Sequence, residues 1–221
     1  MSRIKIAIQG ELGAYSHIAA ERVYKGAEIK TCSTFEETFK QAYNDPDYKI
    51  VIPIENSLAG RVADIHYLFP KYKLQIHGEY FLPVEHNLLG KLDASIDDIK
   101  FVRSHAQAIS QCQNIISKKK FKPIISVDTA GSAKDLAEGT DKSIAAIASD
   151  LSAKMYNLKI LEKNIEDEKG NVTRFLIMGK NIEQPEYENN KKFITSCIFR
   201  VKSEPSALYK CLGGFATNQV N

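Results

Sequence analysis

The segment Asn171-Val172-Thr173-Arg174-Phe175 leads directly into the apolar run Leu176-Ile177-Met178. This pattern predicts a loop that feeds a buried strand, with a hydroxyl and a guanidinium side by side at the junction. A strand that enters a core seldom begins with an arginine unless the arginine meets solvent, a carboxylate or a ligand. We therefore take Thr173 as the candidate reacting group and expect the rest of the chain to form a pocket around it. On this pentapeptide alone, a β-branched strand residue beside a surface charge is the better interpretation, so the case depends on the remaining sequence.

Predicted strands and helices alternate along the rest of the chain. Strands are expected over residues 4–8, 28–32, 48–52 (ended by Pro53), 74–82, 124–127, 143–148 and 158–161, with one more ending at residue 102. Helices are expected after a Ser16 cap, over residues 34–44, 62–69 and 106–117, up to a left-handed terminator at Gly139, and from residue 150. The alternation is typical of the α/β class with largely parallel sheets. It occurs in two runs, which predicts two lobes with a cleft; residues 80–87 cross into the second lobe and the Thr173 strand returns.

The composition is that of a soluble globular protein, because 43% of the 221 residues are hydrophobic and 26% are charged. No basic surface interleaved with aromatic residues indicates nucleic-acid binding, and no apolar run is long enough to span a membrane. With no signal peptide before the first strand, we expect a cytoplasmic protein with reduced thiols. The four cysteines are scattered and the five histidines lack ligand spacing, so we expect no metal. No Walker or dinucleotide motif is present, so we expect no nucleotide cofactor.

Small and hydroxyl residues recur where predicted strands give way to helices. These junctions are Ala14-Tyr15-Ser16, Asn56-Ser57, Ser104-His105 and Thr129-Ala130-Gly131-Ser132. In an open α/β sheet, ligands bind at the carboxyl ends of strands, where helix N-termini offer unpaired N–H groups and a positive dipole end. We therefore expect a small anion in the cleft. The alternative is that these residues only cap helices, but their recurrence near a Thr-Arg pair favours the anion site.

Five motifs, taken together and in this order, resemble the prephenate dehydratase family. They are Gly10-x-x-Gly13-Ala14-Tyr15-Ser16, Pro53-Ile54-Glu55-Asn56-Ser57-x-x-Gly60, Ser104-His105-x-Gln107-Ala108-x-x-Gln111-Cys112, Asp128-Thr129-Ala130-Gly131-Ser132-Ala133 and Asn171-x-Thr173-Arg174-Phe175. One such motif is a weak signal, whereas the ordered set is specific. The segment Pro205-Ser206-Ala207-Leu208-Tyr209 resembles the opening helix of the ACT regulatory domain that follows in this family.

The resemblance implies a lyase that converts prephenate to phenylpyruvate with loss of CO₂ and water, in the biosynthesis of L-phenylalanine, an aromatic amino acid. It implies an α/β, two-lobed catalytic domain with a cleft, like the type II periplasmic binding proteins, and a partial ACT segment of the α+β type. The expected catalytic domain covers residues 1–180, with lobe I at 1–80 and 172–180 and lobe II at 81–171. A linker over 181–192 and an incomplete ACT domain over 193–221 are expected to follow.

The resemblance also implies roles for individual residues. Thr173 is expected to donate a proton or hydrogen bond to the departing hydroxyl, and Asn56, Ser104 and Gln111 complete the expected catalytic set. The expected substrate-binding residues are Ser16, Ser57, Thr129, Ala130, Ser132, Arg174 and Phe175. Of these, Phe175 is expected mainly to pack behind Thr173.

The C-terminal part raises expectations about regulation. The sequence stops at Asn221, before the Glu-Ser-Arg-Pro segment with which the family contacts phenylalanine. We therefore expect L-phenylalanine, the family's effector, not to bind this chain. A strand over 193–201 and a helix over 205–217 are expected, and these two elements cannot bury a core by themselves. The family assembles partly through its ACT domain, which leaves a homodimer open here.

Two other functions are consistent with the same residues. The first is dehydration of arogenate, the aminated relative of prephenate, which differs by one amino group at the pocket rim. The second is a non-catalytic small-anion binding module of the same fold.

Overall fold

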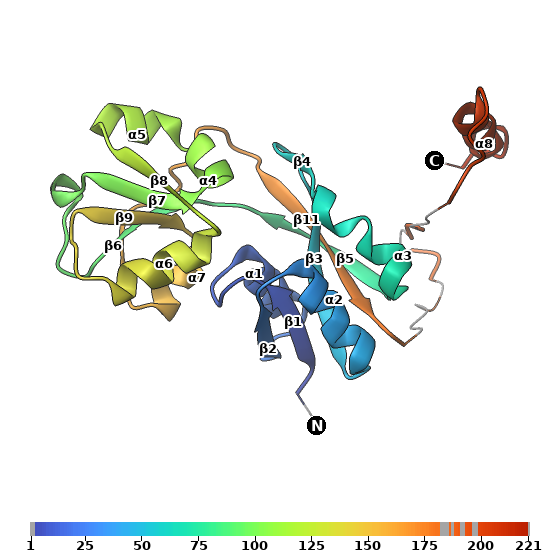
Figure 1. Cartoon of the computed structure of the whole chain (residues 1–221), viewed down its shortest axis with the longest axis horizontal. Coiled ribbons are helices and arrows are strands. Elements are labelled where there is room, and N and C mark those ends of the chain that lie inside the picture. Colours follow the sequence, from blue (N-terminus) through green and yellow to red (C-terminus); the bar gives the residue numbers. More distant parts are fainter. Residues whose placement is uncertain (1–2, 182–185, 187, 191–192, 196–198, 221) are drawn as a thin grey trace. The chain divides into compact units, whose positions relative to one another are not determined.

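The computed structural model describes residues 3–181, 186, 188–190, 193–195 and 199–220 (Figure 1). The chain divides into two compact units, residues 1–185 and 186–221. The first unit contains two mixed sheets, each with helices, and Figure 1 shows them side by side. The α/β class predicted from the sequence is confirmed. The expectation of largely parallel sheets was wrong, because both sheets combine parallel and antiparallel pairs.

The first sheet has the strand order β2-β1-β3-β11-β5. Its strands are β2 (Glu28–Cys32), β1 (Lys5–Gln9), β3 (Tyr48–Asn56), β11 (Val172–Gly179) and β5 (Gln75–Pro83), with β4 (Gly60–Arg61) paired to β3. Its helices are α1 (Tyr15–Val23), α2 (Phe35–Asn44), α3 (Leu68–Tyr72) and the short 3₁₀ helix Ala63–Ile65. Alternation along β3 supplies both faces of this sheet, because Ile50 and Ile52 belong to one buried cluster and Val51 to another.

The second sheet has the strand order β10-β6-β9-β7-β8. Its strands are β10 (Lys159–Glu162), β6 (Asn87–Gly90), β9 (Ile144–Ala148), β7 (Phe101–His105) and β8 (Lys122–Ser126). Its helices are α4 (Ala106–Ser110), α5 (Gln113–Lys119), α6 (Thr129–Glu138), α7 (Asp150–Met155) and the 3₁₀ helix Ile96–Asp98. The apolar run predicted as a central strand is β9, which is buried and lies in the middle of the order.

Two chain segments connect the sheets. Residues 84–86 lead from β5 to β6, and residues 163–171 lead from β10 to β11. These segments are hydrogen-bonded to each other, since Val84 N donates to Asn171 O at 2.8 Å and Ile165 N donates to His86 O at 2.8 Å. We call this pair of segments the hinge.

Four local predictions differ from the structure. Pro53 does not end β3, because it sits at the register shift opposite Phe175, where a missing N–H is tolerated. Residues 62–69 do not form one helix, since they are divided between the 3₁₀ helix and α3. Ser16 is not the cap of α1, whose N-cap is Ala14. Gly139 ends α6 with a φ of −70° rather than in the left-handed region.

The predicted helix over residues 106–117 is broken into α4 and α5. Gln111 closes α4 and Cys112 opens α5. The break matters for function, because it places Gln111 at a helix end rather than inside a continuous helix. Its side chain can then point toward the hinge.

The second unit contributes α8 (Ala207–Thr217) to the described residues. The helix predicted over 205–217 is present, and it carries no buried residue. The predicted strand over 193–201 includes residues 196–198, and the predicted linker includes residues 182–185, 187 and 191–192, which lie outside the described residues. The described residues on either side of 196–198 are not in a strand.

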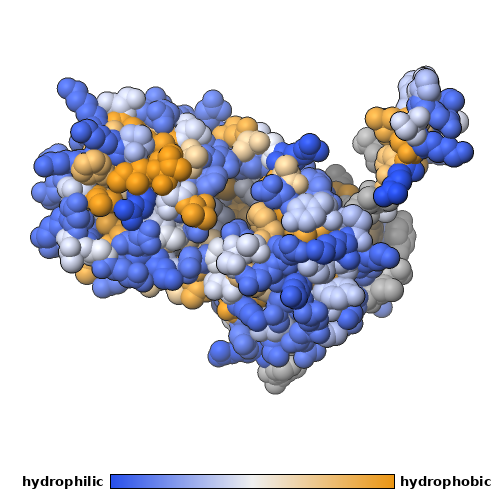
Figure 2. All heavy atoms as spheres, in the orientation of Figure 1, coloured by the Kyte–Doolittle hydropathy of each residue, from blue (hydrophilic) through white to orange (hydrophobic). Residues whose placement is uncertain are grey.

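No helix in the described part of the chain combines the length and the apolar character needed to cross a bilayer. Figure 2 shows hydrophilic residues over most of the visible face, with apolar residues in smaller patches.

Candidate active site

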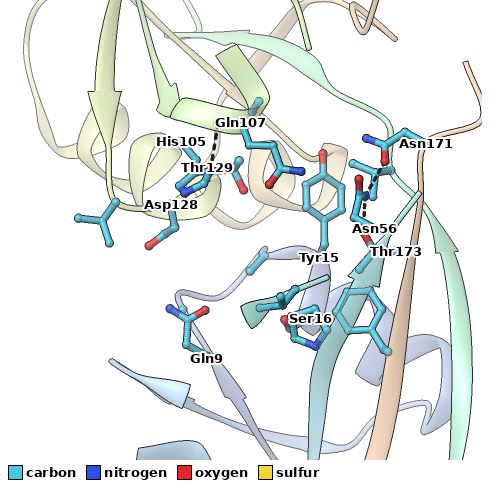
Figure 3. Close-up of a pocket in the computed structure, with 18 of the residues that line it drawn as sticks. Gln9, Tyr15, Ser16, Asn56, His105, Gln107, Asp128, Thr129, Asn171 and Thr173 are labelled. Atoms are coloured by element: carbon cyan, nitrogen blue, oxygen red, sulfur yellow. Dashed lines mark hydrogen bonds between the residues drawn. The ribbon is translucent and has the colours of Figure 1, made fainter. Parts of the chain in front are cut away.

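A cavity of about 410 Å³ lies within the first unit and is lined from both sheets and the hinge (Figure 3). This volume is in the range of small-molecule sites. The first sheet and its helices contribute Gln9, Gly10, Ala14, Tyr15, Ser16, Phe35, Pro53, Asn56, Val62, Asp64, Thr173 and Phe175. The second sheet and its helices contribute His105, Gln107, Ala108, Gln111, Val127, Asp128 and Thr129, and the hinge contributes Val84, His86 and Asn171.

Thr173 and Asn56 meet because β11 and β3 pair antiparallel with these two residues opposite each other. Asn56 Nδ2 donates to Thr173 Oγ1 at 2.9 Å. The orientation of the Asn56 amide is fixed by the main chain, since Asn56 Oδ1 accepts from Leu58 N at 3.1 Å and from Ala59 N at 2.9 Å. A threonine hydroxyl has one proton and two lone pairs. With Asn56 donating to one lone pair, the proton of Thr173 is available to a group in the cavity.

Side-chain amides continue this contact from the first sheet to the second. Asn56 Nδ2 also donates to Asn171 Oδ1 at 2.6 Å, and Asn171 Nδ2 donates to Gln111 Oε1 at 3.0 Å. Figure 3 shows Asn56, Asn171 and Thr173 grouped on one side of the cavity. These contacts bring together three of the four predicted catalytic residues, Thr173, Asn56 and Gln111.

A pair formed by the half-buried Tyr15 and the buried His86 continues from Gln111. His86 Nε2 lies 2.9 Å from Gln111 Oε1, and His86 Nδ1 lies 2.8 Å from the Tyr15 hydroxyl. Burial raises the pKa of Tyr15 well above its usual value, with the nearby Cys112 as the next cause. Burial also lowers the pKa of His86, opposed by the Gln111 hydrogen bond and by Glu166. Both groups are therefore neutral near pH 7.

Helix N-termini supply the positive potential in this cavity. Among the described residues that line it, none is a lysine or an arginine, while Asp64 and Asp128 are acidic. The α1 terminus has no side-chain cap at Ala14 and no acidic residue in its first turn, and its first residues, Ala14, Tyr15 and Ser16, line the cavity. The α6 terminus begins at Thr129, with Asp128 as its cap. Both termini suit a carboxylate.

Several predicted residues lie outside the cavity lining. Ser104 is fully buried and donates to Ile147 O at 2.7 Å, so the expectation that it surrounds the substrate is not met by its position. Ser132 turns back to donate to Asp128 O at 2.8 Å, and Ala130 is fully buried in the same helix turn. Ser57 connects the loop to the hinge, donating to Gly170 O at 3.1 Å and accepting from Val172 N at 2.9 Å.

Arg174 also lies outside the lining, because strand alternation points it away from Thr173 and Phe175. Its guanidinium is paired with Glu79 at 2.7 Å and lies 4.0 Å from Glu55. The predicted binding residues that do line the cavity are Ser16, Thr129 and Phe175. Phe175 is 1% exposed and belongs to a buried apolar cluster, in agreement with packing behind Thr173.

Sequence reasoning gave no role to Tyr15, His86 or Asn171, which are hydrogen-bonded within this site. Tyr15 and Asn171 stood inside quoted motifs but were given no role, and an amide next to a Thr-Arg pair was the available signal. His86 carries no motif; it follows Pro83-Val84-Glu85 in a segment predicted only as a crossover. Within the described residues, no three His, Cys, Asp or Glu side chains converge as a metal site.

A sequence model of the family described as prephenate dehydratase matches residues 6–183. The chain belongs to the prephenate dehydratase family. A relative from Komagataeibacter europaeus, named a bifunctional N-acyl-homoserine lactone acylase/prephenate dehydratase, is 39% identical over 98% of this chain and 76% of its own length. A chloroplastic relative from Arabidopsis thaliana, named arogenate dehydratase/prephenate dehydratase 2, is 39% identical over 100% of this chain.

The chain spans 57% of the length of that Arabidopsis relative. Among solved structures, one described as GqqA, a novel type of quorum quenching acylase, superposes with a TM-score of 0.85. It is 37% identical, and the match covers 98% of this chain and 78% of that one. The family model therefore covers residues 6–183, and the structural match covers 98% of the chain.

Proposed function

We propose that this chain is a lyase that converts prephenate to phenylpyruvate, releasing CO₂ and water. The observation that carries the proposal is the state of the Thr173 hydroxyl. It accepts a hydrogen bond from an amide whose orientation is set by two backbone N–H groups, and it lines the cavity. A hydroxyl held in this way is an oriented proton donor.

The reaction requires one proton at the leaving oxygen. The bond between the ring and its carboxylate breaks to release CO₂, and its electron pair enters the ring. The ring C–O bond breaks on the opposite side of the ring, and the oxygen leaves as water with the proton from Thr173, which then recovers a proton from solvent. A threonine is a weak acid, but aromatisation of the ring drives the departure, and Asn56 Nδ2 stabilises negative charge that develops on Thr173 Oγ1.

Binding of a dianion is assigned to the two helix termini. The α1 terminus with Ser16 and the α6 terminus with Thr129 each offer N–H groups to one carboxylate. Gln111 orients the substrate from the helix break, and Phe175 closes the apolar side behind Thr173. A carboxylate in place of Thr173 would add to the negative charge of Asp64 and Asp128 in the lining and repel such a substrate further, which favours a neutral donor at this position.

Arogenate is the second candidate substrate. The Arabidopsis relative carries both names, and the carboxylate of Asp64 in the cavity lining suits the ammonium group that distinguishes arogenate. Incubation of the purified chain with prephenate and with arogenate near neutral pH separates the two, because phenylpyruvate or phenylalanine then appears. We expect turnover of prephenate; absorbance from neither product would favour the non-catalytic anion-binding module.

The acylase name of the Komagataeibacter relative is tested separately, by incubating the purified chain with an N-acyl-homoserine lactone and measuring hydrolysis of its amide bond. A hydroxyl nucleophile needs a neighbouring base. Of the histidines that line the described cavity, His86 is bonded to Tyr15 and Gln111, and His105 Nδ1 accepts from Gln107 N. Neither set of bonds reaches Ser16 or Thr173, which supports the dehydratase over a serine–histidine hydrolase.

A further inference from the structure

The hydrogen bonds between Asn56 and Gln111 have a fixed polarity. Backbone N–H groups can only donate, so those of Leu58 and Ala59 identify the oxygen of the Asn56 amide without ambiguity. The NH₂ group of Asn56 therefore faces Asn171, which must present its oxygen there at 2.6 Å. The NH₂ group of Asn171 then faces Gln111, which presents its oxygen at 3.0 Å.

The same polarity determines which nitrogen of His86 carries the proton. Gln111 Oε1 is an acceptor, and His86 Nε2 lies 2.9 Å from it, so Nε2 must carry a hydrogen. An unprotonated Nε2 would place its lone pair opposite the lone pairs of Gln111 Oε1, which is repulsive. In the neutral ring, Nδ1 then carries the lone pair and faces the Tyr15 hydroxyl at 2.8 Å. The single proton of that hydroxyl is shared between Nδ1 and Glu85 O, which also lies at 2.8 Å.

The position of His86 is clamped at both its main-chain and side-chain ends. Its N–H donates to Glu166 Oε2 at 2.9 Å and its carbonyl accepts from Ile165 N at 2.8 Å, so the second hinge segment holds it. The residue is 3% exposed, and its ring meets the Tyr15 ring edge-on with centroids 5.7 Å apart. The imidazole has little freedom to rotate away from Gln111.

We propose that His86 is a positioning residue for the dehydratase reaction, which fixes the Gln111, Asn171 and Asn56 amides through its Nε2–H and thereby orients the Thr173 hydroxyl. The proposal rests on the proposed function for its kinetic consequences. Consecutive side-chain contacts of 2.6 to 3.0 Å connect Tyr15, His86, Gln111, Asn171 and Asn56, in this order, to Thr173. His86 acts through other residues, so its loss misaligns the donor without removing it.

The kinetic test compares His86→Leu with His86→Gln. A glutamine amide N–H can occupy the place of Nε2–H and donate to Gln111 Oε1, whereas leucine keeps bulk and offers no donor. We expect kcat of His86→Leu to fall about 10²-fold, the scale of a small misplacement of a reacting group, with KM changed less than about threefold. We expect His86→Gln to regain most of that loss.

Two kinetic outcomes overturn the proposal. One is a kcat of His86→Leu equal to that of the wild type. The other is an equal loss in both variants while each unfolds at the wild-type temperature, which would assign the effect to ring shape rather than to the Nε2–H. The exposed His66, outside the cavity, is the matched control, and His66→Gln is expected to leave kcat and KM unchanged.

A spectroscopic test determines which ring nitrogen of His86 carries the proton, and it needs no substrate. ¹⁵N-histidine spectra of the wild type are recorded at about pH 8, above the ordinary histidine pKa of about 6.5. The His86 signals are those absent from His86→Gln and present in His66→Gln. We expect a protonated Nε2 and a bare Nδ1; the reverse assignment overturns the proposal. Because no turnover is needed, this result judges His86 even if prephenate proves not to be the substrate.

Discussion

The two sides of the cavity use their polar side chains differently. On the side of the first sheet and the hinge, Thr173, Asn56 and Asn171 are bonded to one another, so each orientation depends on its neighbour. On the side of the second sheet, Gln111 joins this set through Asn171, whereas Asp128 and His105 are bonded to the backbone of the helices that they start. A set of mutually oriented side chains suits a step in which a proton must be aimed, whereas a helix N-terminus suits the binding of an anion through the N–H groups that its cap leaves unpaired.

The largest effect is expected from Thr173→Ala, which removes the proposed donor. We expect kcat to fall about 10²- to 10⁴-fold, the usual range for a general acid, while prephenate still binds. Turnover kinetics and calorimetric titration measure the two quantities. Thr173→Ser keeps a hydroxyl and is the matched control, which should retain more activity than alanine. Unchanged kcat in Thr173→Ala would remove Thr173 from the chemistry.

Asn56→Asp tests the polarity of the donor with almost no change of shape. A carboxylate beside Thr173 Oγ1 accepts the threonine proton and no longer donates to the oxygen, and it also faces the Leu58 and Ala59 N–H groups as an acceptor. We expect kcat to fall about 10²- to 10³-fold, as on loss of one preorganised donor. A variant with wild-type kcat at neutral pH would show that the direction of this hydrogen bond is irrelevant.

The pH dependence of the free energy of unfolding tests whether the buried His17 and His86 are neutral in the folded protein. Burial lowers the pKa of both His17 and His86. The unfolded chain therefore binds protons near about pH 6.5, where the folded chain does not, and the free energy of unfolding falls as pH decreases below this value. We expect up to about 1.4 kcal/mol per pH unit for each histidine, measured by urea unfolding between about pH 7 and 5.

The same unfolding series in His86→Gln provides the comparison. Removal of one of the two groups is expected to reduce the slope by about half, because each contributes one proton. An unaltered slope would mean that His86 is already protonated in the folded protein at these pH values.

Thr129→Val tests the binding side. The hydroxyl at the start of α6 is available to a carboxylate, and valine preserves the shape of the side chain. We expect KM for prephenate to rise about tenfold, the worth of one charge-assisted hydrogen bond, with little change in kcat. A fall in kcat with constant KM would instead place Thr129 with the reacting groups.

The smallest effect is expected from Ser104→Ala. The hydroxyl is fully buried and donates to Ile147 O, away from the cavity lining. We expect the free energy of unfolding to drop by about 1 kcal/mol through the unpaired carbonyl, and kcat to stay within about twofold of the wild type. A kcat loss as large as that of Thr173→Ala would return Ser104 to the catalytic set that its motif implies.

The sequence was informative about features that a local motif or a local pattern of strands and helices determines. The ordered motifs put Thr173 and Asn56 in one expected site, and the alternation of predicted strands and helices indicated the fold class. The sequence around Arg174 suggested a ligand, whereas strand alternation places its side chain against Glu79 and outside the cavity lining. The role of His86 could not be read at all, since its partners Tyr15 and Gln111 lie 71 and 25 residues away.

The most direct measurement is a crystal structure of Thr173→Val with prephenate bound, since valine keeps the shape of threonine without its proton. We expect the ring hydroxyl of prephenate beside residue 173 and Asn56, with its carboxylates at the N-termini of α1 and α6. A ring hydroxyl on the side of the second sheet, or prephenate bound outside this cavity, would contradict it.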